Sequence, residues 1–234
     1  MTQSHHEIPE HVESAGEGFS LAPSIPNDER TDDSGIAMAD TYFSADVETD
    51  GPIPGPFSML SFALVKAGSF DGARFVRPAS YDTHLYLELR PVSGKYDIEA
   101  LRVTGINRDH FVADGHDPRA AMTMASEWVA QHSQGTQPVL VAYPLGFDWT
   151  WLYWYFMQFS DYGSPFLHSK CFDLKTAYAV KAGVTISQAG RSRIPPHLRG
   201  VHQHTHHALD DAIEQAELFA NVFEWRPTWT CPKP

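Results

Sequence analysis

The chain has few cysteines, no long apolar run and a shortage of basic residues, and each absence excludes a class of protein. Its two cysteines, Cys171 and Cys231, are too few for the disulfide framework of a small secreted domain. No stretch reaches the ~18 consecutive apolar residues of a membrane-spanning helix, and the N-terminus lacks a basic segment followed by an apolar one. We therefore expect a cytoplasmic protein that does not bind membranes.

Acidic residues outnumber basic ones, with 29 Asp and Glu against 17 Lys and Arg, so the net charge is -12. Eight of these acids and a single Arg fall within residues 1–38, a segment with little apolar periodicity. This composition predicts a disordered acidic tail over 1–38, a folded domain over 39–225 and a short C-terminal tail over 226–234. The acidic balance argues against tight, sequence-independent binding to long duplexes, which requires a basic face.

Apolar patterning predicts that strands come first and that helices then alternate with strands. Asp117 followed by Pro118 is typical of a helix start, because Asp caps a helix and proline suits its first position. This order predicts an α/β domain with a mixed sheet covered by helices on both faces, and a surface loop over 184–205. The predicted strands are 41–47, 57–65, 73–77, 85–89, 138–143 and 166–172, and the predicted helices are 97–103, 117–132, 147–159, 173–181 and 207–223.

Two carboxylates, Asp46 and Glu48, lie at the end of the first predicted strand. Side chains two residues apart in a strand point to the same face, so the pair is expected side by side before the turn at Asp50-Gly51-Pro52. Adjacent anions at the edge of an apolar sheet repel each other and lose hydration. A divalent cation would relieve both costs, whereas the simpler alternative is a solvated strand end.

Two further aspartates are predicted where the sheet meets helices. Asp148 follows an apolar strand and a Pro/Gly turn, and Asp211 lies early in the last predicted helix. Taken singly, each is explained by the preference of acids for the first turn of a helix. The four acids in this order are a more specific indication of function than any one of them.

The ordered set resembles the DEDDh branch of the DEDD exonuclease superfamily, to which proofreading exonucleases, RNase T and oligoribonuclease belong. The resemblance covers residues 41–223 and implies a ribonuclease H-like fold with a mixed five-stranded sheet. In one departure, Tyr143-Pro144 stands where the family usually has His-Asn, so we expect a difference in the positioning of either the 3′-terminal nucleotide or the helix end, and the substrate preference stays open. The three matching motifs are Asp46-Val-Glu48-Thr49, Phe147-Asp148 and His206-x-Ala208-x-x-Asp211.

The resemblance implies a 3′–5′ exonuclease that uses two divalent cations, Mg²⁺ or Mn²⁺, and releases nucleoside 5′-monophosphates. In the family pattern Asp46 bridges both ions, Glu48 and Asp211 complete the site that activates water, and Asp148 holds the second ion. Carboxylate oxygens are the ligands that such hard cations prefer. The expected partner is the 3′ end of single-stranded DNA or RNA, and the sequence leaves open which of the two.

A histidine is expected to take the proton from water, because its unperturbed pKa lies near neutrality. His206 stands five residues before Asp211, as in the DEDDh pattern, and His207 stands four before it, where a related branch carries tyrosine. We favour His206 as the general base, and His207 is the alternative. Exposed histidines at a helix start are the simpler reading of the pair.

The loop after the first strand is the predicted place for the terminal nucleotide. Thr49, Phe57, Met59 and Trp149 are the candidate substrate-binding residues, with Phe57 and Met59 equally suited to core packing. The rival functions are a catalytically silent nucleic-acid-binding or polymerase-associated module of the same fold, and a metal-storage protein. The storage function would use the four histidines His202, His204, His206 and His207. The sequence is compatible with a homodimer and does not determine the oligomeric state.

Overall fold

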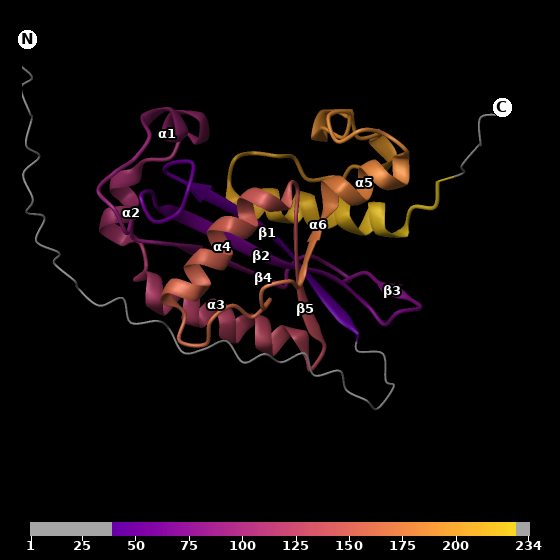
Figure 1. Ribbon diagram of the computed structural model, residues 1–234, viewed down its shortest axis with the longest axis horizontal. Coiled ribbons are helices and arrows are strands. Elements are labelled where there is room, and N and C mark those ends of the chain that lie inside the picture. The colour runs from indigo at the N-terminus through magenta and orange to yellow at the C-terminus, as the bar shows by residue number, and fades with distance from the viewer. Residues whose placement is uncertain (1–38, 228–234) are drawn as a thin grey trace, which may run out of the picture. The chain divides into compact units, whose positions relative to one another are not determined.

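The computed structural model describes residues 39–227, which form a mixed sheet and the helices that cover it (Figure 1). Two short 3-10 turns, Arg191–Arg193 and Pro196–Leu198, lie between the last two helices. The strands are β1 (Asp40–Thr49), β2 (Met59–Phe70), β3 (Phe75–Val76), β4 (His84–Glu88), β5 (Gln137–Ala142) and β6 (Cys171–Asp173). The helices are α1 (Ile98–Thr104), α2 (Arg108–Asp114), α3 (Pro118–Ser133), α4 (Leu145–Phe159), α5 (Leu174–Ala182) and α6 (Ala208–Glu224).

The strand order is β3-β2-β1-β5-β6, with β4 also paired to β2. Strand β2 is antiparallel to β1, whereas β5 is parallel to β1 and β6 is parallel to β5. β3 pairs with residues 69–70 of β2 and β4 with residues 61–65, so the two short strands share one edge. Six strands therefore occupy five positions, and the mixed five-stranded α/β arrangement expected from the sequence is confirmed.

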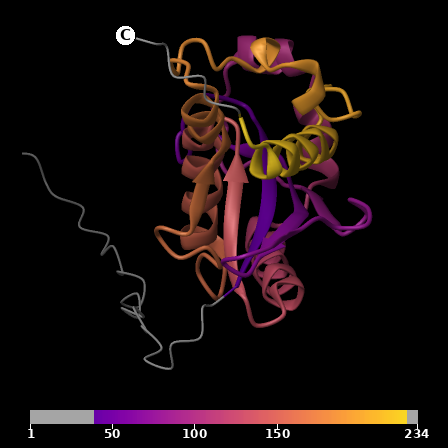
Figure 2. The same ribbon diagram turned by 90° about the vertical axis from the view of Figure 1, so that its right-hand side faces the viewer.

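Helices cover both faces of the sheet, as Figure 1 and the 90° view in Figure 2 show. Phe43, Ala45 and Val47 of β1 pack in one buried cluster with α3 and α4, whereas Tyr42 packs in a second cluster with α5 and α6. Because strand side chains alternate, the even-numbered positions of β1 face α6. Asp46 and Glu48 therefore belong to the α6 face.

Helix α6 lies close to the sheet because the side it presents there carries small residues. Ala208, Ala212 and Ala216 are spaced by four, share one side of the helix and are fully buried. Gln215 lies next to this side, and its Nε2 donates to Ser44 Oγ at 3.1 Å and to the Ala45 carbonyl at 2.8 Å. The N-terminal half of α6 is thereby held against β1.

The structure corrects three details of the predicted element list. The predicted strand 166–172 is reduced to β6 (Cys171–Asp173), because residues before it form turns around a buried Phe166. Helix α2 was not predicted, since its seven residues bury only Phe111 and give little periodicity. The predicted surface loop 184–205 contains the two 3-10 turns and buries three apolar side chains, Ala189, Ile194 and Leu198.

Two further predictions concern the ends of the chain and membranes. The tail predicted over 1–38 lies outside the described residues, as do positions 228–234 of the predicted C-terminal tail. Within residues 39–227, no helix combines the length and apolar character needed to cross a bilayer.

Candidate active site

Three carboxylates from two distant parts of the chain meet at the α6 face of the sheet. Asp46 and Glu48 come from β1 and Asp211 from the first turn of α6, and one oxygen from each lies within 4.8 Å of the others. Glu48 and Asp211 are buried, with 7% and 1% of their surfaces exposed, and Asp46 is partly exposed. Hard divalent cations take such closely spaced carboxylate oxygens as ligands, so the donor set fits Mg²⁺ or Mn²⁺.

Asp148 is the fourth acid and lies in the first turn of α4, directly after β5. β5 runs parallel to β1, so both strands end at the same side of the sheet. Asp148 is buried, and its charge raises the pKa of both Asp46 and Glu48. The four acids thus form one electrostatic group, with Asp148 outside the tight set of three.

Burial and mutual repulsion make these acids hard to ionise. Burial, followed by the charges of Asp148, Glu48 and Asp211, raises the pKa of Asp46 well above its usual value. Burial and the charges of Asp211 and Asp148 raise the pKa of Glu48 to about 8. Burial raises the pKa of Asp148 to about 7, against hydrogen bonds from backbone N–H groups. A group of this kind gains most from a nearby positive charge.

Arg191 supplies a fixed positive charge beside the acids. Its guanidinium forms an ion pair with Glu214 of α6, donates to the Tyr143 carbonyl at 3.3 Å and lies 5.4 Å from the centre of the Tyr143 ring. The same charge lowers the pKa of Asp46 and Asp148. Sequence spacing does not distinguish Arg191 from the other basic residues of its loop, because only the fold brings the first 3-10 turn next to the acids.

Tyr143, which stands where the family resembled by the sequence usually has histidine, has a structural role here. Its ring is buried, its hydroxyl donates to the Ala189 carbonyl, and its ring and carbonyl both contact Arg191. Burial raises the pKa of Tyr143 to about 12, so the hydroxyl stays protonated at neutral pH. The next residue, Pro144, precedes α4 and is exposed. Tyr143 therefore connects the segment before α4 to Arg191.

The histidines before α6 differ in where their rings point. His206 has φ of 60°, a left-handed conformation uncommon for residues other than glycine, and its backbone N–H donates to Asp211 Oδ2 at 3.1 Å. A ring nitrogen of His206 also lies within 4.8 Å of an Asp211 oxygen. His207 instead stacks on Tyr86 of β4, with ring centres 4.8 Å apart. Between the two candidates for the base, the geometry favours His206.

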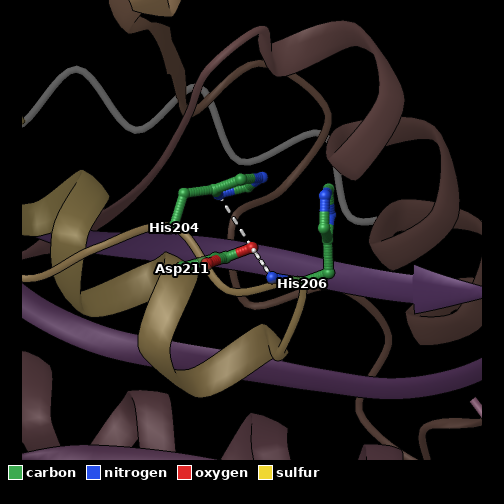
Figure 3. A group of neighbouring side chains, drawn as sticks. All are labelled: His204, His206 and Asp211. Carbon is green, nitrogen blue, oxygen red and sulfur yellow. Dashed lines mark hydrogen bonds and ion pairs between the residues drawn. The ribbon is translucent and has the colours of Figure 1, made fainter. Parts of the chain in front are cut away.

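His204, two residues earlier, also reaches the acids. Its Nδ1 lies 2.8 Å from Asp211 Oδ2, and its ring centre lies 4.6 Å from that of His206. Figure 3 shows the two imidazoles flanking the Asp211 carboxylate. His202 is held elsewhere, with its Nδ1 2.8 Å from Glu217 Oε1. The four histidines therefore do not converge on one ion, which removes the geometric basis of a storage site built from all four.

The structure separates the four predicted substrate-binding residues into two groups. Met59 is fully buried and Phe57 is 9% exposed, with both side chains in the core, so the prediction that they contact a base is corrected. Phe57 packs on Gly51, where an added Cβ would come within 2.2 Å of the ring, and so supports the turn. Thr49 lines a surface hollow together with Glu48, and Trp149 is partly exposed and stacked on Tyr153.

The hollow beside Glu48 has a volume of about 370 Å³ and is framed by the end of β1, the following turn and α1. Phe147 and Val103 contribute exposed apolar surface to it, with 44% and 63% of their surfaces accessible. Sequence spacing does not indicate Val103, because only the folded chain brings α1 beside β1, and it indicates Phe147 only as the neighbour of Asp148. A planar apolar group entering here would lie directly next to the acids.

Comparisons with known proteins agree with this geometry. No protein-family model matches the sequence. The chain is 32% identical over 179 residues to the 3′-5′ DNA exonuclease Cap18 of Escherichia coli, covering 76% of this chain and 89% of that protein. Among solved structures, the nuclease domain of 3′hExo, described as a DEDDh family member bound to rAMP, aligns with a TM-score of 0.59 at 14% identity. That alignment covers 81% of this chain and 94% of that domain.

A second solved structure, Escherichia coli exonuclease I in complex with a dT13 oligonucleotide, aligns with a TM-score of 0.53 at 16% identity. It covers 81% of this chain, which spans 41% of the length of that enzyme. The mixed sheet, the helices on both faces and these likenesses define a ribonuclease H-like α/β nuclease fold. With the sequence relationship added, the chain belongs to the DEDDh family of 3′–5′ exonucleases, which are hydrolases.

Proposed function

We propose that this chain removes nucleotides from the 3′ ends of single-stranded DNA, using two divalent cations, Mg²⁺ or Mn²⁺, and releasing nucleoside 5′-monophosphates. The observation that carries the proposal is the convergence of Asp46, Glu48 and Asp211, whose ligand oxygens lie within 4.8 Å of one another, beside His206. DNA is favoured over RNA because the Escherichia coli relative at 32% identity is named as a DNA exonuclease.

The proposed ligands are Asp46, Glu48, Asp211 and Asp148, and their buried, mutually repelling charges support this assignment. Bound divalent ions would lower the pKa of water and stabilise the charge that develops on the phosphate and on the leaving 3′ oxygen. Asp211 is held ready by backbone N–H groups of Thr205 and His206, which donate to its two oxygens at 2.7 and 3.1 Å.

His206 is the proposed general base and accepts the proton of the attacking water at a ring nitrogen. It stands beside Asp211 and is exposed, so its ring can both reach a water at the acids and release the proton to solvent. We propose that the terminal nucleotide lies in the hollow next to Glu48, surrounded by Thr49, Phe147 and Val103. Trp149 is proposed to offer its face to a base further along the strand.

The test uses matched 5′-labelled DNA and RNA oligomers with Mg²⁺ or Mn²⁺, the wild-type chain and two paired variants. Asp211→Asn is expected to abolish cleavage, and Asp210→Asn, at its exposed neighbour, is expected to retain it. A wild-type chain that leaves both oligomers intact while binding DNA would support the rival function, a silent nucleic-acid-binding module. Isothermal titration with Mn²⁺ separates the two, since the nuclease requires binding that Asp46→Ala removes.

A further inference from the structure

A second group of ligand atoms lies beside the carboxylates and has a different chemistry. His204, His206 and Asp211 each offer one atom, and these three atoms lie within 4.8 Å of one another. Two imidazoles and one carboxylate suit Zn²⁺ and related transition metals, whereas Mg²⁺ selects oxygen ligands and water. We propose that His204, His206 and Asp211 form a Zn²⁺ site that inhibits the nuclease by capturing Asp211 and His206.

The spacing of the three donors is close to what a tetrahedral ion requires. Zinc binds imidazole nitrogen and carboxylate oxygen at about 2.0–2.2 Å, which places neighbouring donors about 3.3–3.5 Å apart. His204 Nδ1 already lies 2.8 Å from Asp211 Oδ2, and the ring centres of His204 and His206 are 4.6 Å apart. The required shift is small, and 38% of the His204 side chain is exposed, which leaves its ring room to turn.

The segment that precedes α6, residues 201–206, is anchored at both ends by hydrogen bonds from its backbone N–H groups to acids of α6. Glu217 accepts from the backbone N–H groups of Val201 and His202 at 2.7 and 3.1 Å, and Asp211 accepts from those of Thr205 and His206 at 2.7 and 3.1 Å. His204 lies between these two anchors, both of which belong to one helix. Figure 3 shows the His204 ring against the Asp211 carboxylate and the His206 ring beside it, with the backbone N–H of His206 bonded to the same carboxylate.

The neighbouring histidines cannot replace these ligands. The ring of His202 is paired with Glu217 Oε1, and the ring of His207 stacks on Tyr86. The site therefore uses two specific imidazoles out of the four in the segment. His207 and His202 provide matched control positions of the same residue type.

Inhibition follows from the shared ligand and rests on the proposed function. Asp211 belongs both to the carboxylate group with Asp46 and Glu48 and to the group with the two histidines. An ion held by His204, His206 and Asp211 would occupy the proposed general base and withdraw one proposed Mg²⁺ ligand at once. Zn²⁺ is thus expected to compete with the active metal and to slow cleavage.

The first test measures metal binding on the full chain without nucleic acid, by Zn²⁺ titration and by the visible absorption of Co²⁺ as a tetrahedral probe. We expect His204→Gln and His206→Gln to weaken Zn²⁺ binding at least about tenfold, and His207→Gln and Asp46→Asn to retain it. The proposal is overturned if His204→Gln binds Zn²⁺ as tightly as the wild type, if Asp46→Asn abolishes binding, or if the wild type binds none.

The second test measures the Zn²⁺ concentration that halves the Mg²⁺-supported cleavage rate, with each variant compared to its own rate without Zn²⁺. His204→Gln is expected to need at least about tenfold more Zn²⁺ than the wild type, and His207→Gln the same amount. Equal inhibition of His204→Gln and the wild type would overturn the regulatory role. If the chain cleaves nothing, the proposed function fails, but the first test still decides whether the Zn²⁺ site exists.

Discussion

Asp46 is the residue where the conflict between stability and chemistry is sharpest. It lies between Glu48, Asp148 and Asp211, and all three charges together with burial disfavour its ionised form. A protein selected only for stability would place a neutral side chain at this position. An acid at this position is best explained by binding of a cation. The stability of the metal-free protein should therefore change when Asp46 is replaced.

We predict that Asp46→Asn stabilises the metal-free protein at alkaline pH while removing activity. A raised pKa means that the contribution of Asp46 to stability is complete below pH ~4 and is lost as the pH rises through the raised value. Asparagine does not ionise, so its advantage is near zero at pH ~3 and grows steadily above pH ~4, to at least ~1 kcal/mol at pH ~8.5. Urea unfolding with a chelator measures the difference, and a pH-independent difference would contradict the explanation.

The two adjacent histidines offer a cleaner test of chemistry. Because His206 lies beside Asp211 and His207 stacks on Tyr86, we predict that His206→Ala lowers kcat by about 10²–10⁴. His207→Ala should change kcat by less than about threefold, since it removes only a stacking contact outside the acids. Single-turnover cleavage under Mn²⁺ checks both, and equal losses would mean that the segment acts through its folding rather than through a base.

At the scale of elements, the turn after β1 is held by a buried ion pair that composition and spacing did not reveal. Asp50 has no exposed surface and accepts from Ser58 N at 2.5 Å and from Arg108 Nε at 2.8 Å. Arg108 opens α2 and also donates to the Ser93 carbonyl. The pair connects the turn to the segments on either side of α1. The turn and α1 both frame the hollow next to Glu48.

We predict that Arg108→Ala destabilises the protein by ~3–5 kcal/mol, because it leaves the Asp50 carboxylate buried without its partner. Arg102→Ala serves as the matched control: its pair with Glu99 is 75% and 65% exposed, so the expected loss is below ~0.5 kcal/mol. Chemical denaturation measures both variants. Similar losses in the two would show that the buried pair has no special role.

At the scale of the whole molecule, the sequence predicted the order of strands and helices along the chain, the helices on both faces of the sheet and the four candidate acids. These features depend on local periodicity and motif spacing. It did not predict Arg191 beside Asp46, nor the pair of Asp50 and Arg108, because each joins segments that only the folded chain brings together. For Met59 it left substrate contact and core packing as equal alternatives, and the structure places this side chain in the core.

Metal binding should raise the thermal stability of the whole domain. With the pKa of Glu48 raised to about 8 and that of Asp148 to about 7, both acids are largely protonated at pH ~6, and a divalent ion must displace these protons. We predict that Mn²⁺ raises Tm more at pH ~8.5 than at pH ~6. Thermal unfolding checks this, and Asp46→Ala should show no such gain. A larger gain at pH ~6 would contradict the proton competition.

The bond from Gln215 Nε2 to Ser44 Oγ spans 171 residues of sequence, and it lies beside the place where Asp211 meets Asp46. During synthesis such a contact cannot form until the later of the two segments has been made. On the ribosome, β1 leaves the exit tunnel long before α6 is synthesised. The nascent chain therefore holds only part of its acidic group, and under the proposed function it would gain nuclease activity only after α6 has been synthesised.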